Sequence, residues 1–123
     1  MMERDNRRGI EAEQLAAEGL EATGYQILET NFRCRYGEID IIASIDNLLI
    51  FVEVKERTVG PWGRAEEAVD QRKIQRMLTT ADHFVLENPE YADHIWRLDL
   101  IAITRRRDGS VLRNRHIENL VID

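Results

Sequence analysis

The sequence contains few of the residues that would point to an oxidising compartment or to a membrane. Cys34 is the only cysteine, so the chain cannot form an internal disulfide, and a lone thiol fits a reducing cytosol. No stretch approaches the roughly 18 consecutive apolar residues of a membrane span. The first eight residues include Arg4, Arg7 and Arg8 and lack the apolar segment of a signal peptide. We therefore expect a cytoplasmic protein with no membrane partner.

A basic excess is also missing. The formal net charge is −6 and the sequence pI is near 5.1, which argues against a strong nucleic-acid binder. However, residues 97–115 contain six arginines against two aspartates, and further basic residues cluster within 33–35, 55–57 and 72–76. A local basic surface on an acidic chain is compatible with salt-sensitive binding to nucleic acid.

Proline is scarce, with only Pro61 and Pro89, so few positions forbid regular structure. A chain of 123 residues with 43% hydrophobic and 33% charged residues predicts one globular domain, residues 1–123. Periodicity predicts helices over about 7–23 and 66–87, and strands over 25–35, 37–57 (a hairpin), 95–103 and 111–121. This order predicts an α/β fold with a mixed four- to five-stranded sheet flanked by helices.

The hairpin carries the most informative pattern. Residues 37–43 and 50–55 both alternate with period two, and Asp46-Asn47 is a plausible two-residue turn between them. With that turn, Asp40 lies opposite Glu53 and Glu38 lies opposite Lys55. The other face then pairs only apolar residues, namely Ile39 with Val54, Ile41 with Val52 and Ala43 with Ile50. A slip by one residue would bury an acid, so the register should be well specified.

Two acids that face each other in a sheet destabilise it, unless they share a cation. Mg²⁺ prefers oxygen ligands and needs only one or two protein carboxylates beside substrate phosphates. Asp40 and Glu53, with the backbone carbonyl of Val54, are the predicted ligands of Mg²⁺ or Mn²⁺. Lys55 projects from the same face as Glu53, where its ammonium could orient water or balance charge. The alternative for Lys55 is an exposed cross-strand salt bridge.

Glu13 falls within the apolar arc of the first predicted helix, between Leu20 and Ala17. One interpretation is a buried salt bridge or a rim position, and the other is a third carboxylate that faces Asp40 and Glu53. The loop 59–63 leaves the lysine-bearing strand, and its Trp62 could pack on the sheet or stack on a base. His83, His94 and His116 have no metal-ligand spacing.

Several motifs in order resemble a known family. They include Gly37-Glu38-Ile39-Asp40, Phe51-Val52-Glu53-Val54-Lys55-x-Arg57, Asn31-x-Arg33, Ala68-Val69-x-x-x-Lys73, Arg97-x-Asp99 and His116-Ile117-x-Asn119. The chain resembles the bacterial YraN family, which is placed in the restriction-endonuclease-like superfamily with the PD-(D/E)XK core. The resemblance implies a fold similar to archaeal Holliday-junction resolvases. It also implies Asp40, Glu53 and Lys55 as the core site and Glu13 as the helix carboxylate. Residue 39 is Ile where the superfamily name has Pro.

Three functional hypotheses follow. The preferred one is a metal-dependent nuclease that hydrolyses phosphodiester bonds in DNA, including branched or damaged DNA. In it Glu13, Asp40, Glu53 and Lys55 are catalytic, and the basic residues Arg33, Arg35, Arg57 and Lys73 bind the nucleic acid. The alternatives are a non-catalytic nucleic-acid-binding module on the same fold and a protein-interaction domain. Related resolvases are symmetric dimers, so the resemblance carries the expectation of a homodimer.

Overall fold

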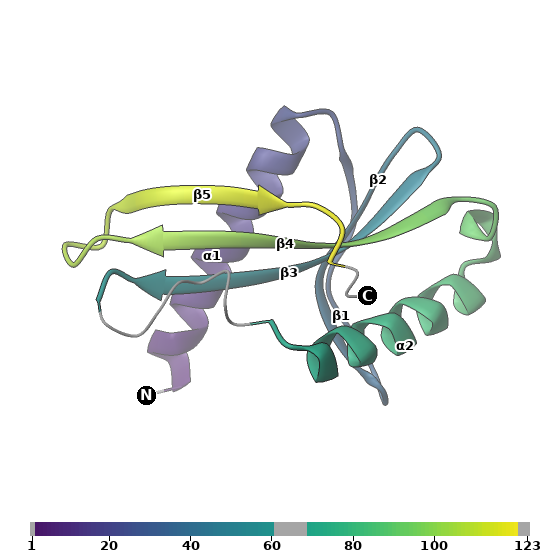
Figure 1. The fold of residues 1–123 in the computed structure, drawn as a ribbon, viewed down its shortest axis with the longest axis horizontal. Helices are drawn as coiled ribbons and strands as arrows, with labels where there is room; N and C mark the ends of the chain where they lie inside the picture. Colours follow the sequence, from purple (N-terminus) through teal and green to yellow (C-terminus); the bar gives the residue numbers. More distant parts are fainter. Residues whose placement is uncertain (1, 61–68, 121–123) are drawn as a thin grey trace.

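One five-stranded sheet organises the protein, with a long helix on each of its faces (Figure 1). The computed structural model describes residues 2–60 and 69–120, with side chains from residue 9 onward. The elements are α1 (Met2–Ala22), β1 (Gln26–Cys34), β2 (Gly37–Ile45), β3 (Leu48–Thr58), α2 (Gln71–Glu87), the 3-10 helix η2 (Pro89–Tyr91), β4 (Ile95–Arg105) and β5 (Val111–Ile117). The predicted α/β class and element order are confirmed.

The strands lie in chain order, β1-β2-β3-β4-β5. Neighbours are antiparallel except β3 and β4, which run parallel over their full lengths. A parallel pair needs a crossover connection, and α2 lies within the one that joins β3 to β4. The sheet is therefore mixed, as the sequence predicts.

Alternation along the central strands divides the buried side chains between two cores. The α1-side core joins α1 to one face of the sheet, and its buried members are Ala12, Ala16, Leu20, Ile41, Ala43, Ile50, Val52, Ile101 and Ile103. The α2-side core lies on the opposite face, and its buried members are Ile39, Ile42, Leu49, Phe51, Ile74, Met77, Ala81, Phe84, Val85 and Leu98. Strands β2 and β3 contribute to both cores, so they are covered on both faces.

Local signals explain where the helices end. Gly24, with φ of 103°, closes α1, and the backbone N–H of Tyr25 donates to the carbonyl of Leu20. The Asp70 carboxylate accepts a hydrogen bond from the N–H of Lys73 at 2.9 Å and caps α2. The predicted start of this helix near residue 66 is therefore wrong at residues 69 and 70, and residues 66–68 lie outside the described ranges, as does Trp62.

One apolar residue of each long helix is exposed although it belongs to the periodic apolar pattern that predicts the helix. Ile10 is 52% exposed and Leu78 is 40% exposed, because each lies at the margin of its helix's apolar face. Thr80 is fully buried instead, and its hydroxyl donates to the carbonyl of Arg76 at 2.8 Å. The last strand also ends earlier than predicted, at Ile117. None of the described helices is long and apolar enough to cross a membrane.

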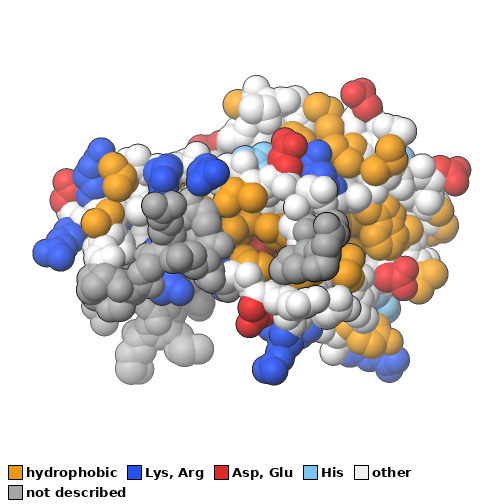
Figure 2. Space-filling view, viewed as in Figure 1, with side chains coloured by type: hydrophobic (Ala, Val, Ile, Leu, Met, Phe, Trp, Pro, Cys, Tyr) orange, Lys and Arg blue, Asp and Glu red, His pale blue; other side chains and the backbone are white. Residues whose placement is uncertain are grey.

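Figure 2 shows one face of the molecule, on which basic and apolar side chains are unevenly distributed. Lys and Arg side chains gather at the end of the sheet where β4 turns into β5, and hydrophobic side chains gather over the opposite end. Part of the basic stretch is structural. The Arg105 guanidinium pairs with Glu56 and donates to the carbonyl of Gly109, and Arg106 donates to the carbonyl of Val111. These arginines hold the β4–β5 turn.

Candidate metal and nucleic-acid site

The β2–β3 hairpin has the predicted register only where its two strands are paired. The pairs run from Ile45 opposite Leu48 to Ile41 opposite Val52, which confirms the Asp46-Asn47 turn. Beyond Val52 the ladder stops, so the predicted pairs of Asp40 with Glu53 and of Glu38 with Lys55 are absent from it. Glu38 instead pairs with Arg33 of β1, with Oε2 3.5 Å from Nε. The alternative interpretation of Lys55, a cross-strand salt bridge to Glu38, is wrong, because Lys55 contacts Glu53.

The alternation of β2 changes sides at Asp40. Ile41 belongs to the α1-side core, yet Ile39 belongs to the α2-side core, where regular alternation would have kept the two together. The neighbouring strand β1 is irregular at the same level, because Asn31 has a φ of 54°. The prediction that Ile39 shares a face with Ile41 is therefore wrong, and the exchange of faces turns Asp40 toward β3.

Asp40 meets β3 through a hydrogen bond. The backbone N–H of Val54 donates to Oδ2 of Asp40 at 2.8 Å. The carboxylate thus takes the place of a backbone partner where the β2–β3 ladder has ended, and it satisfies a backbone donor that would otherwise be left open.

Glu53 is the second acid of the site and is only 4% exposed. Its Oε2 lies 3.3 Å from Nζ of Lys55 and 3.4 Å from Nζ of Lys73, so two ammonium groups meet one carboxylate oxygen. Lys55 comes from β3 and Lys73 from the first turn of α2. The cationic partners provide the compensation that a buried carboxylate requires.

The Asp40 carboxyl holds its proton unusually tightly. Burial is the main cause, the negative charge of Glu53 adds to it, and together they raise the pKa of Asp40 from 3.8 to about 7. The hydrogen bond from Val54 opposes the shift without cancelling it. Asp40 and Glu53 therefore interact electrostatically although they are not paired in the ladder, and a cation between them would relieve the repulsion.

The donor set of this site fits a hard divalent cation. Within the described ranges, Oδ1 of Asp40 and Oε1 of Glu53 have no hydrogen-bond or ion-pair partner, whereas the second oxygen of each carboxylate is bound by the protein. Two carboxylate oxygens match the small protein share that Mg²⁺ uses. The described residues contain no group of three or more His, Cys, Asp and Glu side chains that could hold a metal ion.

Glu13 approaches the site from α1. Its Oε1 accepts a hydrogen bond from Nδ2 of Asn31 at 2.9 Å, and the side chain is half-buried. Burial is the largest cause that raises the pKa of Glu13, the Asn31 hydrogen bond opposes it, and the charges of Glu38 and Glu53 raise it further. Glu13 is thus electrostatically coupled to the acids of the sheet. Asn31, which the sequence analysis did not select, orients it.

Two of the four predicted nucleic-acid-binding residues, Arg33 and Lys73, line one groove, and Lys73 also contacts Glu53. A groove of about 420 Å³ is lined by Arg33, Cys34, Gly37, Glu38, Lys73 and Arg76. Arg35 belongs to the turn that borders this groove, and Arg57 is exposed two residues beyond Lys55 on β3. Arg76 was missed by the sequence reasoning. Its spacing of three residues from Lys73 places both on one side of α2 and could have identified it.

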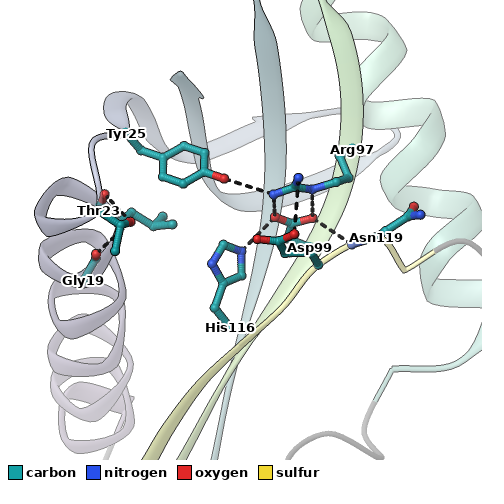
Figure 3. A network of polar contacts seen from close by, with 9 residues as sticks. Gly19, Thr23, Tyr25, Arg97, Asp99, His116 and Asn119 are labelled. Carbon is teal, nitrogen blue, oxygen red and sulfur yellow. Dashed lines mark hydrogen bonds and ion pairs between the residues drawn. The ribbon is translucent and has the colours of Figure 1, made fainter. Parts of the chain in front are cut away.

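A second polar cluster lies around Asp99, which is fully buried (Figure 3). Arg97 binds both of its carboxylate oxygens at 2.8 Å, Nε2 of His116 lies 2.8 Å from Oδ2, and the N–H of Asn119 donates to Oδ1 at 3.0 Å. Arg97 also donates to the hydroxyl of Tyr25 at 3.0 Å. The cluster joins the start of β1 to β4, β5 and the segment that follows β5.

The pKa of Asp99 shows that the surrounding hydrogen bonds fully stabilise its ionised carboxylate. Burial alone would raise it, but the hydrogen bonds from His116, Arg97 and Asn119 outweigh burial and lower the pKa of Asp99 below its usual value. All the carboxylate oxygens are engaged by the protein. The Asp99 cluster is therefore a structural clamp, in contrast to the site of Asp40 and Glu53.

Comparison with known proteins matches most of the chain. The sequence profile described as uncharacterised protein family UPF0102 matches residues 12–103. A UPF0102 protein of Desulforamulus reducens is 37% identical over 112 residues, which cover 90% of this chain and 92% of that protein. The UPF0102 protein of Natranaerobius thermophilus is 44% identical over 97 residues (78% and 82%), and that of Stutzerimonas stutzeri is 36% identical over 116 residues (92% and 97%).

Proposed function

Since the chain belongs to the uncharacterised protein family UPF0102, the YraN family, we propose its function from the chemistry of its own site: metal-dependent hydrolysis of phosphodiester bonds in DNA. The observation that carries the proposal is a pair of carboxylates, the partly buried Asp40 and the buried Glu53, each with one oxygen engaged by the protein and one without a partner among the described residues. The proposal also takes the core to be restriction-endonuclease-like, as the motif resemblance implies.

Asp40 and Glu53 would hold Mg²⁺ or Mn²⁺ through the two open oxygens, with the carbonyl of Val54 as a third ligand. When bound, the cation supplies an acidified water molecule and neutralises charge at phosphorus. Lys55 keeps Glu53 oriented through its 3.3 Å contact and presents positive charge to the reacting phosphate. We assign to Glu13, which Asn31 holds, the role of orienting the attacking water.

Charge around the site supports an anionic substrate. Arg33, Lys73 and Arg76 line one groove together with a single acid, Glu38, and Lys73 connects this groove to Glu53. A phosphate backbone that lies in this groove would contact three cationic side chains. One of them, Lys73, also contacts Glu53, so the groove leads to the proposed metal site. The overall charge of −6 limits non-specific affinity. Binding should weaken as salt is added, because each contact of a basic side chain with a phosphate releases counterions.

The decisive experiment titrates Mg²⁺ and Mn²⁺ against linear, nicked, flapped and four-way DNA. We expect metal-dependent cleavage by the native protein and its loss in the double variant Asp40→Asn/Glu53→Gln. The matched control is Glu29→Gln/Asp46→Asn, which removes the same charge from two exposed positions. Calorimetry with Mn²⁺ should show binding to the native and control proteins and none to the double variant at the Asp40 site.

Full cleavage by the double variant would overturn the proposal. DNA binding that is indifferent to metal and to Lys55→Ala, with no cleavage, would instead establish a non-catalytic binding module. Absence of DNA retention at low ionic strength would favour a protein-interaction domain. Cleavage of four-way DNA by a homodimer, measured by light scattering on the active fraction, would fit two sites related by a two-fold axis.

A further inference from the structure

The turn between β1 and β2 presents an exposed aromatic side chain beside the basic groove. Arg35 and Tyr36 are the only two residues between the paired ends Cys34 and Gly37, so they form the tip of the hairpin. Tyr36 is 39% exposed. The groove of Arg33, Lys73 and Arg76 runs along the same tip, since Cys34 and Gly37 line it.

The Tyr36 ring is held in place by its neighbours. Arg35 lies over the ring, with Cζ 4.9 Å from the centroid, and donates to the hydroxyl at 2.7 Å. The imidazole of His83, from α2, meets Tyr36 edge to face at 5.7 Å. An exposed guanidinium and an anchored aromatic ring each offer a planar face on which a further ring can stack.

The hairpin tip is also fixed against α2 by its backbone. Gly37 has a φ of 154°, and a Cβ added there would lie 3.0 Å from the hydroxyl oxygen of Thr80. Thr80 is itself fully buried. Because the backbone of the turn contacts α2 so closely, the stacking surface keeps its position relative to Lys73 and the groove.

We propose that Arg35 and Tyr36 stack on an unpaired base, so that the substrate of this site is DNA with single-stranded nucleotides next to the cleaved bond. This inference rests on the proposed function. Proteins that bind single strands combine a basic groove for the backbone with aromatic platforms for the bases, and this region contains both. In a blunt duplex every base is paired, so none can reach the platform without being unstacked.

The number of residues between Tyr36 and Asp40 limits how far the stacked base lies from the proposed metal site. Tyr36 precedes Asp40 by four residues of extended strand, which span about 13 Å. Stacked nucleotides advance about 3.4 Å each along one strand. The base that stacks on Arg35 and Tyr36 therefore lies within about four nucleotides of the phosphodiester held at Asp40 and Glu53.

The test compares binding of a single-stranded oligonucleotide of about 16 nucleotides, near the upper site size of one module, with binding of the blunt duplex of the same sequence. Fluorescence anisotropy is measured in EDTA, which prevents cleavage. The native protein should bind the single strand more tightly. Tyr36→Ala should weaken single-strand binding about tenfold, as expected for one lost stacking contact, and leave duplex binding unchanged.

Two further variants separate stacking from folding. Tyr36→Phe keeps the ring and should bind the single strand within about twofold of the native protein. Leu86→Ala removes an exposed apolar side chain, 74% exposed on α2, and should change neither substrate. Thermal melting of each variant checks that the fold is intact.

The inference is overturned if Tyr36→Ala binds the single strand as well as the native protein does, or if the native protein prefers the blunt duplex. These outcomes are distinct from failure of the proposed function. If cleavage depends on metal but is unchanged by Tyr36→Ala, the stacking inference fails and the proposed nuclease function stands. Single-strand binding through Tyr36 without any metal-dependent cleavage removes the nuclease and leaves stacking in place.

Discussion

The backbone N–H of Val54 donates to the carboxylate of Asp40 at 2.8 Å, one step beyond the last paired residues of the β2–β3 hairpin. A side chain thus continues the connection between two strands after their backbones separate. The hydrogen bond fixes Asp40, one of the two acids of the candidate site, at the point where the strands separate.

The first prediction concerns the cost of the Asp40 charge. In metal-free protein at pH 8, Asp40→Asn should raise the free energy of unfolding, on the order of 2 kcal/mol after screening, because it removes a buried charge that Glu53 repels. The amide oxygen of Asn can still accept from Val54. Urea unfolding measures the change, and Asp46→Asn, at the exposed turn, is the control. A destabilised Asp40→Asn would show that the charge itself holds the fold.

The second prediction is a pH dependence of metal binding. With its pKa at about 7, Asp40 is mostly protonated at pH 6 and mostly ionised at pH 8. A cation must displace that proton, so apparent Mn²⁺ affinity should fall by about tenfold per pH unit below 7 and level off above it. Calorimetry from pH 5.5 to 8.5 measures this. An affinity that does not change over this range would contradict the raised pKa.

The same shift predicts the pH dependence of metal-free stability. The folded pKa lies above the unfolded value of 3.8, so the folded state binds the proton more tightly. This contribution of Asp40 is fully present below pH 3.8, decreases as pH rises toward about 7 and is constant above that. Urea unfolding of native protein and Asp40→Asn at each pH isolates it, because the difference between the two should grow over this interval and then stay level.

The third prediction concerns the two lysines on Glu53. Lys55→Ala or Lys73→Ala alone leaves one ammonium at Oε2, so each should cost about 1 kcal/mol of stability. The double variant leaves a buried carboxylate with neither lysine and should cost about 3–5 kcal/mol, more than the sum. A double-mutant cycle by urea unfolding measures the coupling. Glu53→Gln should restore much of the loss, and strictly additive effects would show that the lysines act independently.

The fourth prediction concerns Asp99. Asp99→Asn should destabilise the protein by about 3–5 kcal/mol, because Arg97 then keeps its burial and loses a carboxylate that binds it through both oxygens. The lowered pKa of Asp99 means that its contribution is present above the unfolded value and is lost as pH falls through the folded value. Asp93→Asn, at an exposed position, should change stability by less than about 0.5 kcal/mol. Equal effects of the two variants would contradict the clamp.

Alternation and turn chemistry predicted the hairpin well where both strands are regular. The Asp46-Asn47 turn and five cross-strand pairs follow directly from the sequence. The prediction failed at Asp40 because the change of faces depends on β1, where Asn31 adopts a positive φ, and a neighbouring strand's irregularity has no signal within the hairpin itself. The prediction that Asp40 and Glu53 interact is therefore confirmed by their electrostatic coupling, although the two residues are not paired across the strands as predicted.

The sequence also could not predict contacts between segments that are distant in the chain. The spacing of Arg97 and Asp99 places both on one face of a strand, so their pairing could be predicted. Their contacts with Tyr25, His116 and Asn119 depend on how three strands and the last segment assemble. Likewise, Lys73 was selected as a basic residue, but its approach to Glu53 requires the packing of α2 on the sheet.

The parallel pairing of β3 with β4 has a consequence for how the chain folds. The β1–β2 and β2–β3 hairpins close short loops and can form early, whereas β3 must wait for a strand that lies beyond α2 in the sequence. Until β4 arrives, β3 exposes an open edge along its full length. The slowest step of folding should therefore be the docking of α2 and β4. In refolding experiments, substitutions in α2 should slow folding more than substitutions at the β4–β5 turn do.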